Sequence, residues 1–370
     1  MKTHYIGADV DSKMTELAVE MGPEAYRRHR VPTTIPAIRE VLAGVAGRKC
    51  LAIEEGPMAD WLRRNLKGDV DELIVCDPRR NRLIAQDGPK DDPLDAGRLA
   101  ALGRGGYLKP VYHSDDADRV ALKRWVGLYH DRVKTAVAEI AKLRARCRMD
   151  GVRVPRGVLH RETVRTEWLQ TLEDRTLARQ LEVRWVGYDA VRTQVRQARA
   201  EIRRLAKRWP ILARWEAIPG IGPIRAVTFF VHVDTPFRFA RKSKLWTYAG
   251  IGLMRRSSGT GADGRPKPGR LRLAFAVNRH LKNAVLGAAL SAIRQGGNGS
   301  AAHYERMVQE GAKPSNARHT VARQIAAVMW GMWKSDRPYD PRLAGGRDEG
   351  PSRRTTGDRK KGGGRRTPET

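Results

Sequence analysis

The sequence predicts an α/β domain followed by two all-α or mostly helical regions, and three patterns along the chain indicate this. Over about the first hundred residues, short alternating apolar runs typical of strands are interleaved with amphipathic helical segments. From Asp115 to about Arg208, apolar residues recur at helical spacing among many Arg and Lys residues, without a strand signal. A third region, from Trp215 to about Trp333, is rich in glycine early and helical later.

The alternating apolar runs of the first region give its predicted elements. We expect strands at Tyr5–Val10, Met14–Met21, Tyr26–Val31, Cys50–Ile53 and Glu72–Cys76, and helices at Ile35–Ala46, Met58–Leu66 and Pro93–Leu102. The polar turn Asp11-Ser12-Lys13 separates the first two strands. Three strands followed by the order αβαβα predict a mixed sheet, which is compatible with a ribonuclease-H-like fold.

The remainder of the chain is expected to be mostly helical. Long antiparallel helices, in coiled-coil form, would turn back near Met149–Leu159 and serve either to space two globular units or to dimerise. Further helices are predicted at Leu271–Arg294 and Thr320–Lys334, followed by a disordered basic tail that acts as a nonspecific electrostatic arm. The predicted domains are 1–112, 113–210, 211–336 and 337–370.

Charge narrows the classes of function. The 370 residues include 71 Lys and Arg against 41 Asp and Glu, a net charge of +30, which indicates a polyanionic partner rather than a small metabolite. We find no apolar run near the roughly 20 residues of a membrane span and no apolar core of a signal peptide at the start. Cys50, Cys76 and Cys147 are scattered, which argues against a disulfide framework or a zinc site. We therefore expect a cytoplasmic protein that handles nucleic acid.

Four carboxylates of the first region can converge on one site. Asp9 ends the first strand, Glu54 follows the strand Cys50–Ile53, and Asp92 and Asp95 lie three residues apart on one helix face. Such a cluster repels itself unless metal ions neutralise it, and hard carboxylate oxygens suit Mg²⁺ in phosphodiester chemistry. Each carboxylate taken alone is better explained as a solvated or structural side chain, and only the ordered set favours a catalytic site. Their neighbours Asp11, Glu55 and Asp91 are alternatives within the set.

Two later motifs point to phosphate contact. The stretch Ile218–Pro223 resembles a helix-hairpin-helix turn, in which Gly220 and Gly222 let the backbone approach DNA; a tight loop between two helices is the alternative. Further on, Arg255-Arg256-Ser257-Ser258-Gly259 places serines between arginines and glycines. Such a serine can attack a phosphate while arginine stabilises the developing charge, or it can be an ordinary loop residue. His232, His280 and His303 are expected to be structural or to contact DNA.

The order of these motifs resembles a known family. The residues that carry the resemblance are Gly7-Ala8-Asp9-Val10-Asp11-Ser12-Lys13, Lys90-Asp91-Asp92-Pro93-Leu94-Asp95-Ala96, Ile218–Gly222, Tyr248–Gly252 and Ser258-Gly259. In this order they are similar to the DEDD-type transposases of insertion sequences, described as bridge-RNA-guided recombinases. The likeness spans nearly the whole chain before the tail.

The resemblance implies a mechanism and partners. An N-terminal domain similar to Holliday-junction resolvases would hold Mg²⁺ through Asp9, Glu54, Asp92 and Asp95, and Ser258 would bond covalently to the cut DNA strand. The implied partners are the element-end and target DNA, a noncoding guide RNA that pairs with both, and further copies of the chain in a dimer or tetramer. Localisation would be prokaryotic cytoplasm and nucleoid.

Two details depart from the family pattern, and two other functions remain open. Glu55 can substitute for Glu54, and Ser257 stands beside Ser258, which is chosen only by the glycine after it. A junction nuclease that uses the carboxylates and water would leave Ser258 dispensable. A basic scaffold without catalysis would bind nucleic acid in a salt-sensitive way and cleave nothing.

Overall fold

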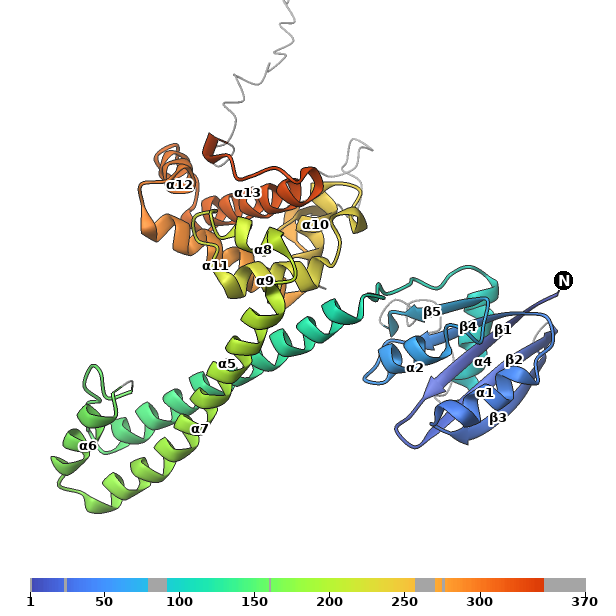
Figure 1. Ribbon diagram of the computed structural model, residues 1–370, viewed down its shortest axis with the longest axis horizontal. Coiled ribbons are helices and arrows are strands. Elements are labelled where there is room, and N and C mark those ends of the chain that lie inside the picture. The colour runs from blue at the N-terminus through green and yellow to red at the C-terminus, as the bar shows by residue number, and fades with distance from the viewer. Residues whose placement is uncertain are drawn as a thin grey trace, which may run out of the picture. The chain divides into compact units, whose positions relative to one another are not determined.

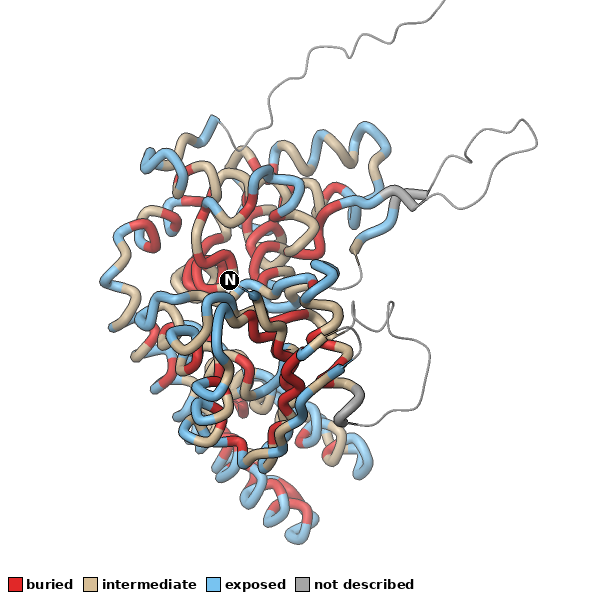
Figure 2. Tube along the Cα trace, turned by 90° about the vertical axis from the view of Figure 1, so that its right-hand side faces the viewer, coloured by how far each residue is buried: buried red, intermediate tan, exposed pale blue. Residues whose placement is uncertain are grey.

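The computed structural model describes residues 2–22, 25–78, 92–159, 161–256, 270–274 and 277–342. It divides the chain into two compact units, Met1–Ala117 and Asp118–Thr370, each of which has its own core. Figure 2 shows buried residues gathered along the sheet and inside the helical bundle. Among the described residues, no helix is long and apolar enough to span a membrane.

The first unit is a five-stranded sheet with helices on both faces (Figure 1). Its strands are β1 (Thr3–Val10), β2 (Met14–Gly22), β3 (Ala25–Pro32), β4 (Arg48–Glu54) and β5 (Glu72–Cys76). Its helices are α1 (Ile35–Ala43), α2 (Ala59–Leu66) and α4 (Asp92–Arg104). The strand order is β3-β2-β1-β4-β5, with β1, β4 and β5 parallel and the other neighbours antiparallel. This confirms the predicted mixed sheet, and it is compatible with a ribonuclease-H-like fold.

The alternation of side chains along β1 divides the first unit into two packed faces. Ile6 and Ala8 belong to a core that also includes Ile38 of α1 and Leu62 of α2. The opposite face carries a smaller cluster in which Leu99 of α4 packs against strand residues. Helix α4 therefore covers the face on which the side chain of Asp9 lies.

Gly7 is the point at which α4 comes closest to the sheet. A β-carbon added there would lie 1.9 Å from the carbonyl oxygen of Ala96 and 2.7 Å from the amide nitrogen of Ala100. Both atoms belong to the backbone, so a side chain cannot be accommodated by a rotamer change. Only glycine at this position lets α4 pack directly on β1.

Substitution of Gly7 by alanine is expected to destabilise the first unit by roughly 3 kcal/mol or more, because α4 must be displaced. Hydrogen exchange of the β1 amides in the full chain measures this loss of stability directly. We expect these amides to exchange much faster in the variant, because the first unit opens more often. Gly56→Ala is the matched control, since nothing lies within 4 Å of a β-carbon at Gly56. Equal protection in the two variants would contradict the packing described.

The two edge strands of the sheet, β3 and β5, are protected in different ways. At β3 the exposed side chains include Arg27, Arg28 and Arg30. At β5 the following chain covers the edge, because the amide of Val111 donates to the carbonyl of Val75 at 2.7 Å and the amide of Asp77 donates to that of Lys109 at 3.2 Å.

The second unit begins with a pair of long helices, α5 (Ala117–Met149) and α7 (Arg175–Ala206), with α6 (Glu162–Gln170) between them (Figure 1). Two side-chain contacts, Arg132 with Gln194 and Arg146 with Gln180, show that α5 and α7 run antiparallel. Their far end has a core around Trp185, and their near end joins the core of the following helices through Leu122 and Ile202.

The rest of the second unit is a helical bundle with a short β-hairpin. Its elements are α8 (Pro210–Trp215), α9 (Pro223–Val233), η1 (Pro236–Arg238), α10 (Lys242–Tyr248), β6 (Leu253–Arg256), β7 (Arg270–Leu273), α11 (Arg279–Gln295), α12 (Gly299–Gln309) and α13 (Pro314–Ser335). Its core surrounds Trp215, whose indole nitrogen donates to the carbonyl of Met329 at 3.0 Å.

One predicted helix boundary is wrong. The segment Leu271–Arg294 was expected to be helical throughout, whereas its first residues belong to β7 and α11 begins only at Arg279. The alternating sequence Arg-Leu-Arg-Leu pairs antiparallel with β6 in the register Leu253↔Leu273 to Arg256↔Arg270. Pairing with β6 makes these residues a strand instead of a helix. The hairpin was not predicted because a long glycine-rich sequence separates its two strands.

Candidate carboxylate site and nucleic-acid interface

Asp9 and Glu54 lie side by side at one end of the sheet. Strands β1 and β4 are parallel, and their last recorded pair is Ala8 with Ile53, so Asp9 and Glu54 follow at the next register position. Side chains at the same position of neighbouring strands point to the same face, here the face covered by α4. Both residues are half-buried. The register therefore places these two predicted site residues together.

A third carboxylate extends this row and was missed by the sequence analysis. Glu16 on β2 pairs directly with Asp9 across the hairpin, and its side chain is only 15% exposed. Arg30, the next residue across on β3, forms an ion pair with Glu16 at 3.2 Å. The signal in the sequence was a Glu at the position of β2 that faces Asp9 across the turn Asp11-Ser12-Lys13, and only the hairpin register makes it visible.

Helix α4 brings its N-terminal end towards the same carboxylates. Its C-terminal residue Arg104 contacts Glu20 at 2.6 Å, at the other end of β2, and Ala96 lies over Gly7. The helix thus runs antiparallel to β1, and Asp95 lies near its start at the Asp9 edge. Asp95 forms an ion pair with Arg98 at 3.0 Å. The backbone of Asp92 opens the helix, and its side chain lies outside the described part.

The structure assigns other roles to two alternative carboxylates. Glu55 accepts from His113 Nε2 at 2.8 Å, and the other ring nitrogen of His113 lies 3.4 Å from Asp60 of α2. Asp11 accepts from the amide of Lys13 at 3.3 Å in the β1–β2 turn. Hydrogen bonds from the amides of Ser12 and Lys13 lower the pKa of Asp11. Both carboxylates therefore hold local structure.

The chemistry of the row suits a hard cation. Its members are carboxylates on adjacent strands, and oxygen ligands of this kind favour Mg²⁺ over softer metals. Among the described side chains, no three His, Cys, Asp or Glu groups lie close enough to hold one ion. The described carboxylates Asp9, Glu16, Glu54 and Asp95 thus do not form a metal-binding group of three by themselves. The side chain of Asp92 lies outside the described residues, so a metal site that includes it stays a prediction.

The two glycines of the predicted phosphate-contacting turn have different environments. Gly220 has φ +83° and faces α11, where an added β-carbon would lie 2.1 Å from the carbonyl oxygen of Ala288. Gly222 is the N-cap of α9, and nothing lies within 4 Å of a β-carbon there. Arg225 fixes the turn by donating to the carbonyl of Gly220 at 2.7 Å and to Ser291 Oγ at 2.9 Å. The open side of the turn is therefore the side of Gly222.

Alanine at these two positions is expected to give opposite results. Gly220→Ala should destabilise the bundle by roughly 3 kcal/mol or more, because it adds a clash with α11 to an unfavourable φ. Gly222→Ala should change stability by less than about 1 kcal/mol and instead weaken binding of duplex DNA, if phosphates approach the start of α9. Thermal unfolding and DNA-binding titrations of both variants check this. A DNA affinity unchanged in Gly222→Ala would remove this turn from the interface.

The predicted serine motif lies at the β6–β7 hairpin. Arg255 and Arg256 belong to the backbone of β6, which pairs with β7, while their side chains are outside the description. Ser257, Ser258 and Gly259 also lie outside the described residues. Their assignment accordingly stays a prediction. What the structure describes is the hairpin that leads into and out of this segment.

The three histidines predicted to be structural or to contact DNA lie in two places in the bundle. His232 is stacked on His280, with ring centroids 5.4 Å apart, and its Nδ1 accepts a hydrogen bond from Asn278 Nδ2 at 2.9 Å. Burial, together with the charge of Lys123 and the proximity of His280, lowers the pKa of His232 to about 3. His232 is thus a neutral packing residue at physiological pH. His303 lies on α12 and lines a cavity.

Comparison with known proteins relates the bundle to one family. Residues 213–305 match the family described as "Transposase IS116/IS110/IS902 family", a range that runs from α8 into α12. Over this range the chain is similar to that transposase family. A relative from Streptomyces coelicolor, "Insertion element IS110 uncharacterized 43.6 kDa protein", is 28% identical over 157 residues. That alignment covers 42% of this chain and 37% of the relative.

The matches confirm the resemblance at the level of the family. The matched range includes the glycine turn of Gly220 and Gly222, the β6–β7 hairpin and the segment that contains Ser258. It does not include the sheet with Asp9 and Glu54. The family match therefore adds nothing to the carboxylate row, which rests on the strand register.

Proposed function

We propose that this protein is the transposase of an insertion sequence and that it cuts and rejoins DNA strands through a covalent serine–DNA intermediate. The observation that carries the proposal is the register of β1 and β4, which places Asp9 beside Glu54 in a chain whose second unit matches an insertion-sequence transposase family. The net charge of +30 fits a DNA substrate and a guide RNA.

The proposed chemistry is a phosphoryl transfer. Ser258 Oγ attacks the phosphorus of the scissile phosphodiester, its proton is removed, and the departing DNA oxygen takes up a proton as its bond to phosphorus breaks. Attack by the hydroxyl of a second strand reverses these steps and releases the serine. Arg255 and Arg256 would stabilise the negative charge on the phosphate oxygens.

The carboxylates of the first unit are proposed to hold the metal ion for this reaction. Asp9, Glu54, Asp92 and Asp95 would hold Mg²⁺, which supplies charge neutralisation at the phosphate. Glu16 adds negative charge next to Asp9, and Arg30 limits that charge by its ion pair with Glu16. A guide RNA that pairs with element and target DNA would choose the sites, and two or more copies of the chain would complete the assembly.

The test combines purified protein, Mg²⁺, labelled element-end DNA, target DNA and the RNA encoded beside the gene. Products are separated on a denaturing gel. Labelled DNA that migrates with covalently attached protein is the expected result. Cleaved DNA without an adduct would favour a junction nuclease that uses water and the carboxylates. Salt-sensitive binding without cleavage under any metal would leave only a nucleic-acid scaffold.

A further inference from the structure

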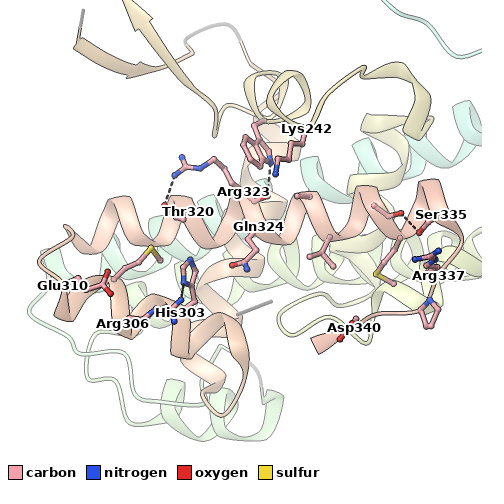
Figure 3. A pocket seen from close by; sticks show the side chains of 17 residues that line it. Lys242, His303, Arg306, Glu310, Thr320, Arg323, Gln324, Ser335, Arg337 and Asp340 are labelled. Atoms are coloured by element: carbon pink, nitrogen blue, oxygen red, sulfur yellow. Dashed lines mark hydrogen bonds between the residues drawn. The ribbon is translucent and has the colours of Figure 1, made fainter. Parts of the chain in front are cut away.

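A large cavity lies in the bundle, and neither the glycine turn nor the β6–β7 hairpin contributes to its lining. It has a volume of about 1150 Å³ and lies between α10, α12, α13 and the residues that follow α13. Figure 3 shows side chains from all of these elements around it. Ligand pockets commonly measure about 300–1,000 Å³, so this cavity has room for a ligand larger than a single small metabolite.

Arg323 contributes a half-buried positive charge to this cavity. Its guanidinium donates to the carbonyl of Ile251 at 3.1 Å and to Thr320 Oγ1 at 2.7 Å, and both of these acceptors are neutral. Within the described part of the chain, no carboxylate lies at ion-pair distance from Arg323. Burial lowers the pKa of this guanidinium, as expected for a charge that is partly withdrawn from water. An anionic ligand would compensate it.

Further cations surround the cavity on several sides. Figure 3 shows Lys242 on the same side of α13 as Arg323, while His303, Arg306 and Glu310 lie on the other side and Arg337 at the far end. The Arg306 guanidinium is 3.0 Å from His303 Nδ1. Of the two carboxylates in the lining, Asp340 already accepts three hydrogen bonds from Arg342 at 3.0 Å, one from its amide and two from its guanidinium. Cations spread in this way suit a ligand with several separated negative charges.

The remaining wall is apolar and includes an aromatic ring. The residues that form it are Trp246, Met307, Val328 and Met332. Trp246 is held in place because its indole nitrogen donates to the carbonyl of Arg323 at 2.9 Å, and Lys242 Nζ lies 5.5 Å from its ring centre. A flat heteroaromatic base can pack on such a surface, and aromatic side chains are common platforms for unpaired bases. A duplex would leave the apolar wall unused, because its bases are stacked inside.

We propose that this cavity binds an unpaired stretch of nucleic acid, with bases against Trp246 and Met307 and phosphates at Lys242, Arg306 and Arg323. The ligand chemistry is that of a single-stranded polynucleotide, whether it comes from RNA or from unwound DNA. The proposal requires that the chain meets nucleic acid and does not require that it cuts DNA, so it stands apart from the chemistry of Ser258.

The test is photocrosslinking and titration with the full chain. Single-stranded RNA containing 4-thiouridine and single-stranded DNA containing 4-thiothymidine are crosslinked, and the modified peptides are mapped by mass spectrometry. We expect crosslinks in peptides of α10, α12 and α13. In titrations, Lys242→Glu should weaken single-strand binding about tenfold, and Lys242→Ala should lower the slope of log affinity against log salt by about 0.7. Tighter binding of either the RNA strand or the DNA strand shows which of the two nucleic acids the cavity takes.

Lys244→Glu is the matched control, because Lys244 is an exposed cation on the same helix that does not line the cavity. Equal weakening by Lys242→Glu and Lys244→Glu would overturn the proposal, since it would show only general surface attraction. Crosslinks confined to other regions would also overturn it. Equal binding of an abasic strand, or equally effective competition by polyglutamate, would show a site for any polyanion and not for unpaired nucleotides.

Discussion

Replacing Ser258 by alanine is expected to abolish the covalent protein–DNA adduct while DNA and RNA binding stay nearly intact. The substitution removes the attacking oxygen and one small polar group, whereas the phosphate contacts proposed at the arginines and the α9 turn remain. The measurement is a denaturing gel with labelled element-end DNA, run beside a binding titration of the same preparation. Wild-type protein should give the adduct, and Ser258→Ala should give none.

Ser257→Ala is the matched control for this experiment, because it makes the same chemical change at the neighbouring residue. We expect it to retain the adduct. Loss of the adduct in Ser257→Ala alone would move the nucleophile by one residue. If Ser258→Ala lost binding and cleavage in parallel, the serine would be a contact or folding residue, and its assignment as nucleophile would be wrong.

Replacing Asp9 by asparagine is expected to lower metal-dependent strand cleavage by at least about 1000-fold, because one ligand charge at the proposed Mg²⁺ site is lost. Asp92→Asn and Asp95→Asn are expected to act in the same direction. The measurement is cleavage of labelled DNA across a titration of Mg²⁺, and higher metal concentration should restore part of the activity in a variant that binds the ion weakly. Near-wild-type recombination in any of the three would refute the acidic cluster.

Glu55→Gln is the control, because it removes a neighbouring negative charge that is not proposed to bind the metal. Glu55 is next to Glu54 in the sequence, but its carboxylate is engaged by His113 at 2.8 Å. We therefore expect this variant to keep its metal dependence, with at most a small loss of stability. If Glu55→Gln lost activity and Glu54→Gln retained it, the ligand would be Glu55, and the β1–β4 register would not define the site.

The sheet was predictable because local patterns and tertiary packing agree there. The strand predicted at Glu72–Cys76 has the same bounds in the structure. The other four predicted strands each begin and end within two residues of the observed strands. Alternating apolar residues on β1 and β2 reflect a real two-sided environment, with a core on one face and α4 on the other. Periodicity reports such burial directly.

Other features depend on contacts that no local pattern contains. Glu16 joins the carboxylate row only through hairpin register, and the role of Gly220 depends on α11, which follows it by tens of residues. The cavity around Arg323 brings Lys242 of α10 and Arg306 of α12 to two sides of α13. For the serine motif, the sequence still carries the whole assignment. The acidic residues could thus be proposed from the sequence, while their spatial order required the register.

The edges of the sheet limit how copies of this chain can associate. Arg27, Arg28 and Arg30 place positive charge along the outer strand β3, and the chain around Val111 is bonded to the C-terminal end of β5. Two copies that tried to join their sheets at β3 would bring like charges together, and at β5 they would meet the chain that already covers its C-terminal end. The N-terminal unit therefore resists intermolecular strand pairing and the aggregation that such pairing causes.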